Sequence, residues 1–309
     1  MKQAILKTLA YSDVFSFPLA KVEIWRFLIW EKKTKEPLKK EFEKSLRKLI
    51  KEKTIGEKEG FFYLKNKAGL VSKRKKLEKI NREKLKIARR FTQKIKFIPW
   101  VKAILITGAL AVGNAKGGDD IDLLVITSEK RLWLTRFLAV FLAEVLWVRR
   151  RPGQKDVKNK ICFNLFLSEN YLKISAKNQN LFTAHEIAQA RLVFEREKTY
   201  QDFLNANLWV RKYLPNGFTS HQPPTPEGGQ AATSHQQDSK LKNKTSAFSN
   251  QPSAILNLLE SLAYNLQIKY MESKKTSEKV SKNFAFFHPK KRGKVILSNY
   301  TRKIRKISV

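Results

Sequence analysis

The sequence predicts an α/β (α+β) fold in which a central sheet-forming segment is flanked by mainly helical regions. Two observations lead to this prediction. Apolar strand-like and helical segments alternate between residues 101 and 168, whereas helical spacing of apolar residues dominates the chain on both sides. The chain has 309 residues, of which 42% are hydrophobic, so it is long enough for two or three domains with a sizeable core.

Residues 1–66 are predicted to form a small N-terminal domain of three helices and a hairpin. The third helix covers about residues 36–51, and one of its faces carries Phe42, Leu46 and Leu49. A hairpin with a polar tip follows over residues 55–64. This order resembles a winged-helix domain, which implies that the third helix, with Lys44 and Arg47, is the recognition helix. A winged helix can also serve as a protein-docking module.

The rest of the chain divides into five segments by composition. Residues 67–97 are predicted as a Lys/Arg-rich linker helix, and residues 98–170 as the core. A helical region is expected over residues 171–216. Residues 217–252 are rich in Gly, Ser, Gln and Pro and predict a disordered linker or insertion. Residues 253–309 are predicted to contain an amphipathic helix and a basic tail.

Four elements are expected within the core. Strands are predicted over residues 101–107, 120–127 and 161–167, and an apolar helix over residues 131–148. The helix is strongly apolar, but it is short and contains charged residues. A membrane span needs about 20 apolar residues, so the sequence favours a buried helix and no membrane span.

The second strand of the core opens with two carboxylates, Asp120 and Asp122. Residues two apart on a strand point to the same face, so both carboxylates project together while Ile121 turns into the core. Like charges this close disfavour joint ionisation, and a divalent cation such as Mg²⁺ or Mn²⁺ removes that conflict. Gly108 ends the preceding strand, where it lets a phosphate approach the backbone and the following helix start. A metal beside an anion cradle suits phosphoryl or nucleotidyl transfer by in-line displacement.

This stretch resembles the signature of the DNA polymerase beta-like nucleotidyltransferase superfamily, in which a glycine precedes an acid-apolar-acid-apolar run by about ten residues. Here Gly108 matches the glycine, and Asp120-Ile-Asp122-Leu matches the run. The resemblance implies a nucleotidyltransferase core that uses a nucleoside triphosphate with Mg²⁺ or Mn²⁺. It also implies two sets of site residues. Nucleotide binding falls to Gly108, Ala109, Asn114 and Lys116, and metal binding to Asp120, Asp122 and Asn164, with the two aspartates as catalytic residues.

Two positions depart from the family pattern. Ala109 stands where the family has Ser or Gly, so a hydroxyl contact to a phosphate is lost. Asn164 stands where the family has a third carboxylate; an amide carbonyl can ligate a metal, but it cannot act as a base. Other acids could substitute for it, namely Asp119, Asp156, Glu169 or Glu186.

The sequence therefore leaves two functions open. The first is an enzyme that transfers a nucleoside monophosphate from a nucleoside triphosphate to a hydroxyl of RNA, a small molecule or a protein. The alternative is a catalytically degenerate nucleotidyltransferase-fold protein that acts as a nucleic-acid-binding or regulatory module. Discrimination between them depends on whether Asp120 and Asp122 are needed for activity.

Charge and cysteine content narrow the partners and the compartment. Lys and Arg number 63 against 27 Asp and Glu, so the formal net charge is +36. Such a charge attracts polyanions, and RNA or DNA are among the expected partners, although a solvated Lys-rich surface is the alternative. Cys162 is the single cysteine and the N-terminus does not resemble a signal peptide, so a cytoplasmic location is expected.

Overall fold

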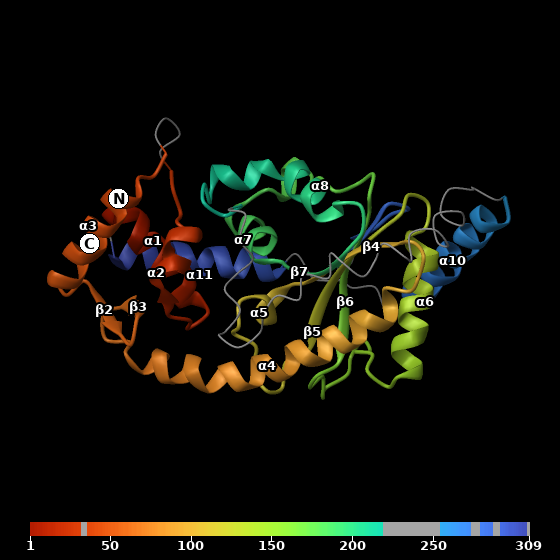
Figure 1. Cartoon of the computed structure of the whole chain (residues 1–309), viewed down its shortest axis with the longest axis horizontal. Helices are drawn as coiled ribbons and strands as arrows, with labels where there is room; N and C mark the ends of the chain where they lie inside the picture. The colour runs from red at the N-terminus through yellow and green to blue at the C-terminus, as the bar shows by residue number, and fades with distance from the viewer. Residues whose placement is uncertain (32–35, 219–253, 273–278, 287–290, 308–309) are drawn as a thin grey trace.

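The computed structural model describes residues 1–31, 36–218, 254–272, 279–286 and 291–307 and shows a mixed α/β protein with two sheets (Figure 1). The predicted α/β (α+β) class is therefore confirmed. The predicted linker over residues 217–252 lies almost entirely outside the described residues. No helix in the described ranges combines the length and apolar character that crossing a membrane requires.

A six-stranded sheet forms the centre of the molecule, with the strand order β7-β4-β5-β6-β9-β8. Strands β4 (Val101–Ile106), β5 (Ile121–Thr127) and β6 (Ile161–Ser168) agree with the three predicted strands to within about a residue. Strand β5 pairs antiparallel with β4 and parallel with β6. Asp120 itself lies just before β5, whereas Asp122 lies within it.

Alternating side chains of the sheet enter two separate cores. Ile104, Leu123 and Val125 pack on one face against helices α4 (Gly69–Ile95), α6 (Leu132–Val145) and α10 (Ala254–Glu272). Leu105 and Leu124 pack on the other face against α7 (Leu181–Gln189), α8 (Thr199–Ala206) and a 3-10 turn, Leu208–Lys212. Because alternate side chains of a strand point to opposite faces, each strand contributes residues to both helical layers. A short 3-10 turn, Ala176–Asn178, precedes α7.

The N-terminal unit has its own small sheet and core. Its elements follow the order α1 (Lys2–Val14), β1 (Leu19–Ala20), α2 (Lys21–Arg26), α3 (Lys39–Lys51), β2 (Ile55–Lys58) and β3 (Phe61–Leu64). The sheet order is β1-β3-β2. The predicted apolar face of the third helix is confirmed, since Phe42, Leu46 and Leu49 are buried. Helix α2 is short: it ends at Arg26, and the buried apolar residues Leu28 and Ile29 lie beyond it.

Helix α4 connects the two sheets along one edge of the molecule (Figure 1). It then turns into β4, and the short helix α5 (Gly108–Ala111) follows that strand. Tyr11 and Phe27 of the N-terminal unit join the core around α7, so the two units share apolar contacts. The cleft between them is therefore lined by α1, α2, α4, α5 and α7.

Two predictions for the second half of the chain need correction. The region predicted to be helical over residues 171–216 contains strand β7 (Arg191–Glu195), which pairs antiparallel with β4. The predicted basic tail contains strands β8 (Lys279–Val280) and β9 (Phe284–Phe286) and helix α11 (Lys291–Ile307). Strand β9 pairs with β6, because its aromatic residues complete the apolar sheet. Both errors arise from pairing partners that are distant in sequence.

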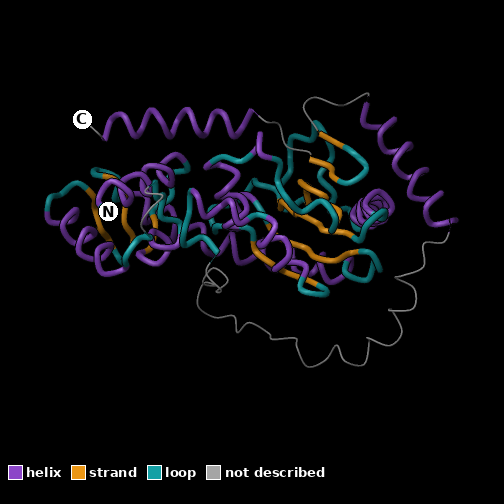
Figure 2. The backbone as a smooth tube through the Cα atoms, turned by 90° about the horizontal axis from the view of Figure 1, so that it is seen from above, coloured by secondary structure: helices purple, strands orange, loops and turns teal. Residues whose placement is uncertain are grey.

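Helix α11 returns to the N-terminal unit and packs along α1 (Figure 2). One buried carboxylate marks this contact: Asp13 is 7% exposed and accepts hydrogen bonds from Lys67 and Lys303. Its two partners come from the hairpin–α4 connection and from α11. A buried carboxylate without them would carry a large desolvation cost, so both lysines stabilise the junction.

Candidate functional site

The two predicted aspartates lie together where β5 begins. Ile121 is fully buried between them, which directs the flanking side chains to the opposite side. Cys162 of β6 lies beside them, because the parallel pairing places it opposite Asp122. One ligand atom from each of Asp120, Asp122 and Cys162 lies within 4.8 Å of the other two. The structure therefore gathers two carboxylates and a thiol at one point.

Gly108 lies directly against this group. Its φ is +64°, a left-handed conformation that suits glycine. A Cβ added at this position would lie 2.5 Å from the carboxylate oxygen Oδ2 of Asp122, a distance that no real Cβ tolerates. The backbone around it is also fixed, since the N–H of Thr107 donates to the carbonyl of Asp122 at 3.0 Å. Two separate constraints thus require a glycine here.

Arg150 brings positive charge to the same group. Its guanidinium lies 3.0 Å from Oδ2 of Asp120, and the same nitrogen approaches the Cys162 sulfur at 3.4 Å. A parallel bridge between Arg149 and Ile161 fixes the segment beside β6. Burial and the neighbouring Asp122 raise the pKa of the Cys162 thiol well above its ordinary value, so the thiol stays protonated at neutral pH.

The Gly-rich loop between α5 and β5 is held from α4 by two buried polar side chains. The carboxamide of Asn81 donates to the carbonyl of Ala115 and accepts from its N–H, each at 3.0 Å. Lys84 is 1% exposed, and its ammonium donates to the carbonyls of Gly117 and Asp119 and to Oδ1 of Asn159. Burial lowers the pKa of Lys84, and its three acceptors compensate for the lost water. The helix therefore fixes the loop that carries Asp120.

The predicted nucleotide-binding residues occupy different positions. Gly108 and Ala109 line a cavity between the core and the N-terminal unit. Asn114 lines the same cavity, but its carboxamide donates to the carbonyl of Phe15 at 3.1 Å. Lys116 is exposed in a turn in which its N–H donates to the carboxylate of Asp119 at 2.8 Å. The structure thus brings three of these four residues to one cavity and leaves the fourth at its surface turn.

Asn164, the predicted third metal ligand, follows Cys162 by two residues on β6. A register shift in the β5–β6 pairing occurs at this point, between Leu123 and Leu124. The Asn164 amide nitrogen lies 3.5 Å from the hydroxyl of Thr107. Its role as a ligand remains a prediction. Sequence reasoning did not identify Cys162, Arg150, Asn81 or Lys84 as site residues; the period-two spacing of Cys162 from Asn164 was the available signal.

The donor set can be compared with the metals expected from the sequence. Asp120 and Asp122 supply carboxylate oxygens, which Mg²⁺ and Mn²⁺ prefer, and both ions complete their shells with water or substrate phosphates. A protonated thiol adds no ligand for these ions, because a thiolate is the ligating form. The two carboxylates therefore fit Mg²⁺ or Mn²⁺, provided that the cation competes with Arg150.

Three comparisons with known proteins were made for the whole chain. No family model, no curated protein and no solved structure matches it.

Proposed function

We propose that this protein is a metal-dependent nucleotidyltransferase that moves a nucleoside monophosphate from a nucleoside triphosphate to a hydroxyl acceptor. The observation that carries the proposal is the contact between Gly108 and Asp122. A glycine with φ of +64° and no room for a Cβ stands against a carboxylate at a strand start, 4.8 Å or less from a second carboxylate. This combination leaves the backbone open to a phosphate beside a metal site.

Each residue has a separate part in this proposal. Asp120 and Asp122 hold Mg²⁺ or Mn²⁺, which supplies charge stabilisation to the triphosphate when bound. Gly108 gives a phosphate access to the backbone, and Arg150 offers a guanidinium with a geometry suited to phosphate. The acceptor hydroxyl oxygen bonds to the α-phosphorus, its proton passes to water, and the bond to the bridging oxygen breaks to release pyrophosphate. The lone cysteine is compatible with the cytoplasm as the site of this reaction.

The third position of the acidic group decides how fast this reaction can be. The family that the sequence resembles has a third carboxylate on the neighbouring strand, and this chain has Cys162 opposite Asp122 and Asn164 two residues later. Neither residue can act as a base in its neutral form. We therefore infer slow transfer, with substitution of Cys162 by Asp as the change that would accelerate it.

Transfer of α-labelled nucleotide tests the proposal. The purified protein is incubated with Mn²⁺ or Mg²⁺, each labelled triphosphate and a mixture of RNA, metabolites and protein acceptors, beside the Asp120→Asn/Asp122→Asn double variant. Label that moves to an acceptor with the native pair and not with the variant supports the enzyme. Equal labelling with both proteins contradicts it.

A second candidate function is a nucleic-acid-binding module with a degenerate transferase core. The observation that favours it is the basic surface of α3, where Lys44, Arg47 and Lys48 are exposed. The helix–strand–helix–helix–strand–strand order of the N-terminal unit supports a winged-helix arrangement in which α3 would be the recognition helix. Salt-sensitive RNA or DNA binding that is lost in Lys44→Glu/Arg47→Glu but retained in Asp120→Asn/Asp122→Asn would favour this function. Unchanged binding in the α3 variant would exclude α3 as the reader.

A further inference from the structure

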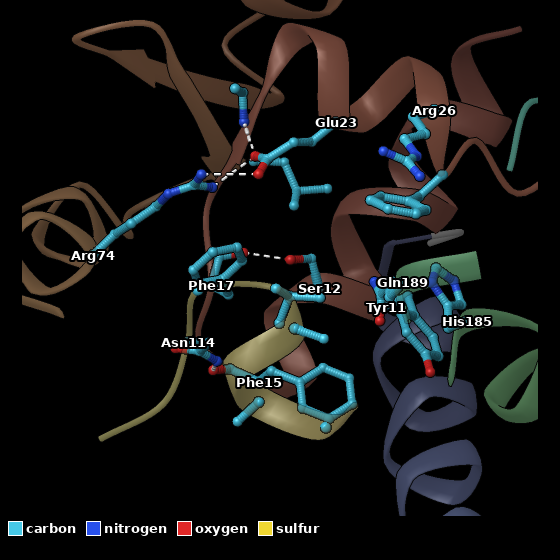
Figure 3. A pocket seen from close by; sticks show the side chains of 18 of the residues that line it. Tyr11, Ser12, Phe15, Phe17, Glu23, Arg26, Arg74, Asn114, His185 and Gln189 are labelled. Carbon is cyan, nitrogen blue, oxygen red and sulfur yellow. Dashed lines mark hydrogen bonds and ion pairs between the residues drawn. The ribbon is translucent and has the colours of Figure 1, made fainter. Parts of the chain in front are cut away.

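A large cavity lies between the N-terminal unit and the core, with Gly108 in its lining. Its volume is about 620 Å³, within the range of small-molecule sites. Helices α1 and α2 form one wall, and α4, α5, α7, β7 and α11 contribute to the others (Figure 3). The cavity is therefore large enough for an organic molecule of nucleotide size.

Two arginines bring positive charge to the lining of this cavity. Arg26 of α2 and Arg191 of β7 both line it, and burial lowers the pKa of each guanidinium. Within the described ranges neither forms an ion pair with a carboxylate, and Nε of Arg26 is buried without a hydrogen-bond partner. Arg74 also lines the cavity, but its guanidinium does form an ion pair: it donates two hydrogen bonds to the Glu23 carboxylate, at 2.7 and 2.8 Å. Both arginine side chains, Arg26 and Arg191, are half-buried, and the attraction of Glu23 offsets part of the Arg26 charge. Glu78 and Glu186 also line the cavity, so an anionic ligand would add to a counter-charge that is already partly present.

Aromatic rings stand beside the Arg26 guanidinium. Tyr11 and His185 stack with ring centroids 3.9 Å apart and an interplanar angle of 8°. Phe27 lies near His185, and the Arg26 guanidinium lies 5.3 Å from the Phe27 ring centroid. Figure 3 shows Arg26, Tyr11 and His185 on the same side of the cavity. Flat apolar walls next to cations suit a ligand that has a flat apolar body and an anionic group.

His185 adds a directional polar group. It is 3% exposed, and burial lowers its pKa to about 3, so the imidazole is neutral at neutral pH. The side-chain amide of Gln189 lies 3.4 Å from Nδ1. In the tautomer in which Gln189 donates to Nδ1, the ring proton is on Nε2. Nε2 is buried and has no hydrogen-bond partner in the described part of the chain. A neutral N–H donor of this kind suits a carbonyl, hydroxyl or phosphate oxygen of a ligand.

We propose that this cavity is a binding site for a small organic anion with a flat, aromatic body, held by Arg26, Arg191 and the Nε2–H of His185. Its occupant also touches Gly108 and Ala109, the backbone that borders Asp122. The binding site does not depend on the proposed transferase activity, although an occupant with a hydroxyl would lie near the transfer site. A carboxylate and a phosphate ester share the required chemistry.

Binding of 1-naphthyl phosphate to the full chain, measured by titration calorimetry, tests the proposal. We expect binding of 1-naphthyl phosphate and 1-naphthoate at micromolar to millimolar concentrations, with neutral 1-naphthol and inorganic phosphate each at least about tenfold weaker, since each lacks one of the two recognised features. Stronger binding of the phosphate or of the carboxylate identifies the anionic group that the site prefers. Equal binding of 1-naphthol would overturn the anion site, as would no binding of either naphthyl anion at millimolar concentration.

Substitution of the arginines locates that binding. Arg26→Gln and Arg191→Gln should each weaken 1-naphthyl phosphate binding about tenfold, while Arg211→Gln, an exposed control outside the cavity lining, should not. Both cavity variants should also melt at a higher temperature than the native protein without ligand, because each removes a half-buried positive charge that has no ion pair among the described residues. Native affinity in both stable variants would overturn the assignment.

Discussion

Gly108 lies between two charged regions, the acidic group of Asp120 and Asp122 and the cavity that contains Arg26 and Arg191, and the two differ in how their charge is paired. In the acidic group, Asp120 is already paired with Arg150 at 3.0 Å, so the protein supplies the counter-charge itself. In the cavity, Arg26 and Arg191 line an open volume without an ion pair from the described residues. Arg150 thus offsets part of the charge of the acidic group, whereas the described residues supply no ion pair to the two arginines of the cavity. The comparison teaches that a cation must compete for the acidic group, whereas an anion is recruited by the cavity.

The largest expected effect concerns the acidic group. Asp122→Asn should reduce nucleotide transfer by at least about 100-fold, the scale of losing one group that stabilises transition-state charge. Its near-equal size leaves the contact with Gly108 intact, so folding should persist. Labelled-nucleotide transfer and thermal melting measure the two properties. Asp202→Asn removes the same charge from the exposed side of α8 and should be silent; equal loss in both variants would contradict the site.

Substitution of Gly108 tests whether the close approach of its backbone to Asp122 requires a glycine. Gly108→Ala should destabilise the protein by about 2–3 kcal/mol, because the residue is left-handed and the new Cβ meets Asp122 at 2.5 Å. Gly113→Ala is the matched control, since Gly113 has φ of +78° and a Cβ added there would meet no heavy atom within 4 Å, so it should show the backbone cost alone. Urea unfolding measures both. If the two variants are equally unstable, the close approach to Asp122 has no energetic weight.

Protonation of His185 tests the cavity side. Its folded pKa of about 3 lies below the unfolded value of 6.5, so the neutral form is favoured by folding. Stability from this group is therefore present above pH 6.5 and is lost as pH falls below it. Between pH 7.5 and pH 5 the loss should be about 2 kcal/mol. Urea unfolding of the native protein and of His185→Phe at both pH values isolates the contribution of His185 to the free energy of unfolding. Identical pH dependence in the two proteins would contradict a buried neutral imidazole.

The smallest expected effect concerns Arg150. Arg150→Gln should tighten Mn²⁺ binding about two- to fivefold, because partly exposed ion pairs contribute about 0.2–1 kcal/mol and the competing cation is removed. Manganese binding measured by electron paramagnetic resonance gives the affinity without nucleotide. Arg151→Gln, which disrupts a pair with Glu144, is the control. Weaker Mn²⁺ binding in Arg150→Gln would show that the guanidinium assists the site instead of competing with the metal.

The fold was predictable where local pattern decides it. The three core strands, the apolar face of α3 and the adjacency of Asp120 and Asp122 follow from period-two and helical spacing. Strand β7 was missed because its partner β4 lies about 90 residues earlier in the sequence, and short strands carry weak local signals. Strand β9 was missed for the same reason.

Only the part of the candidate site that lies within one continuous segment of the sequence was predictable. The Lys/Arg-rich composition of residues 67–97 predicts a solvated surface for Lys84, yet this residue lies on the buried stripe of α4 with Asn81, Leu85 and Ala88. Helical spacing contained that information, but a lysine in a basic segment is ordinarily solvated. Arg150 could not be assigned, because only the fold places its loop beside Asp120. The cavity likewise depends on the docking of the N-terminal unit, which no local pattern specifies.

The buried carboxylate of Asp13 has a consequence for synthesis of the chain. One of its two lysine partners, Lys303, is made 290 residues later. During translation the junction between α1 and α11 therefore stays incomplete until nearly every other described element has left the ribosome. Contacts this distant in sequence are slow to form, because a long loop must close first. The N-terminal unit can fold early, but its contact with α11 forms only after residues 291–307 have been made.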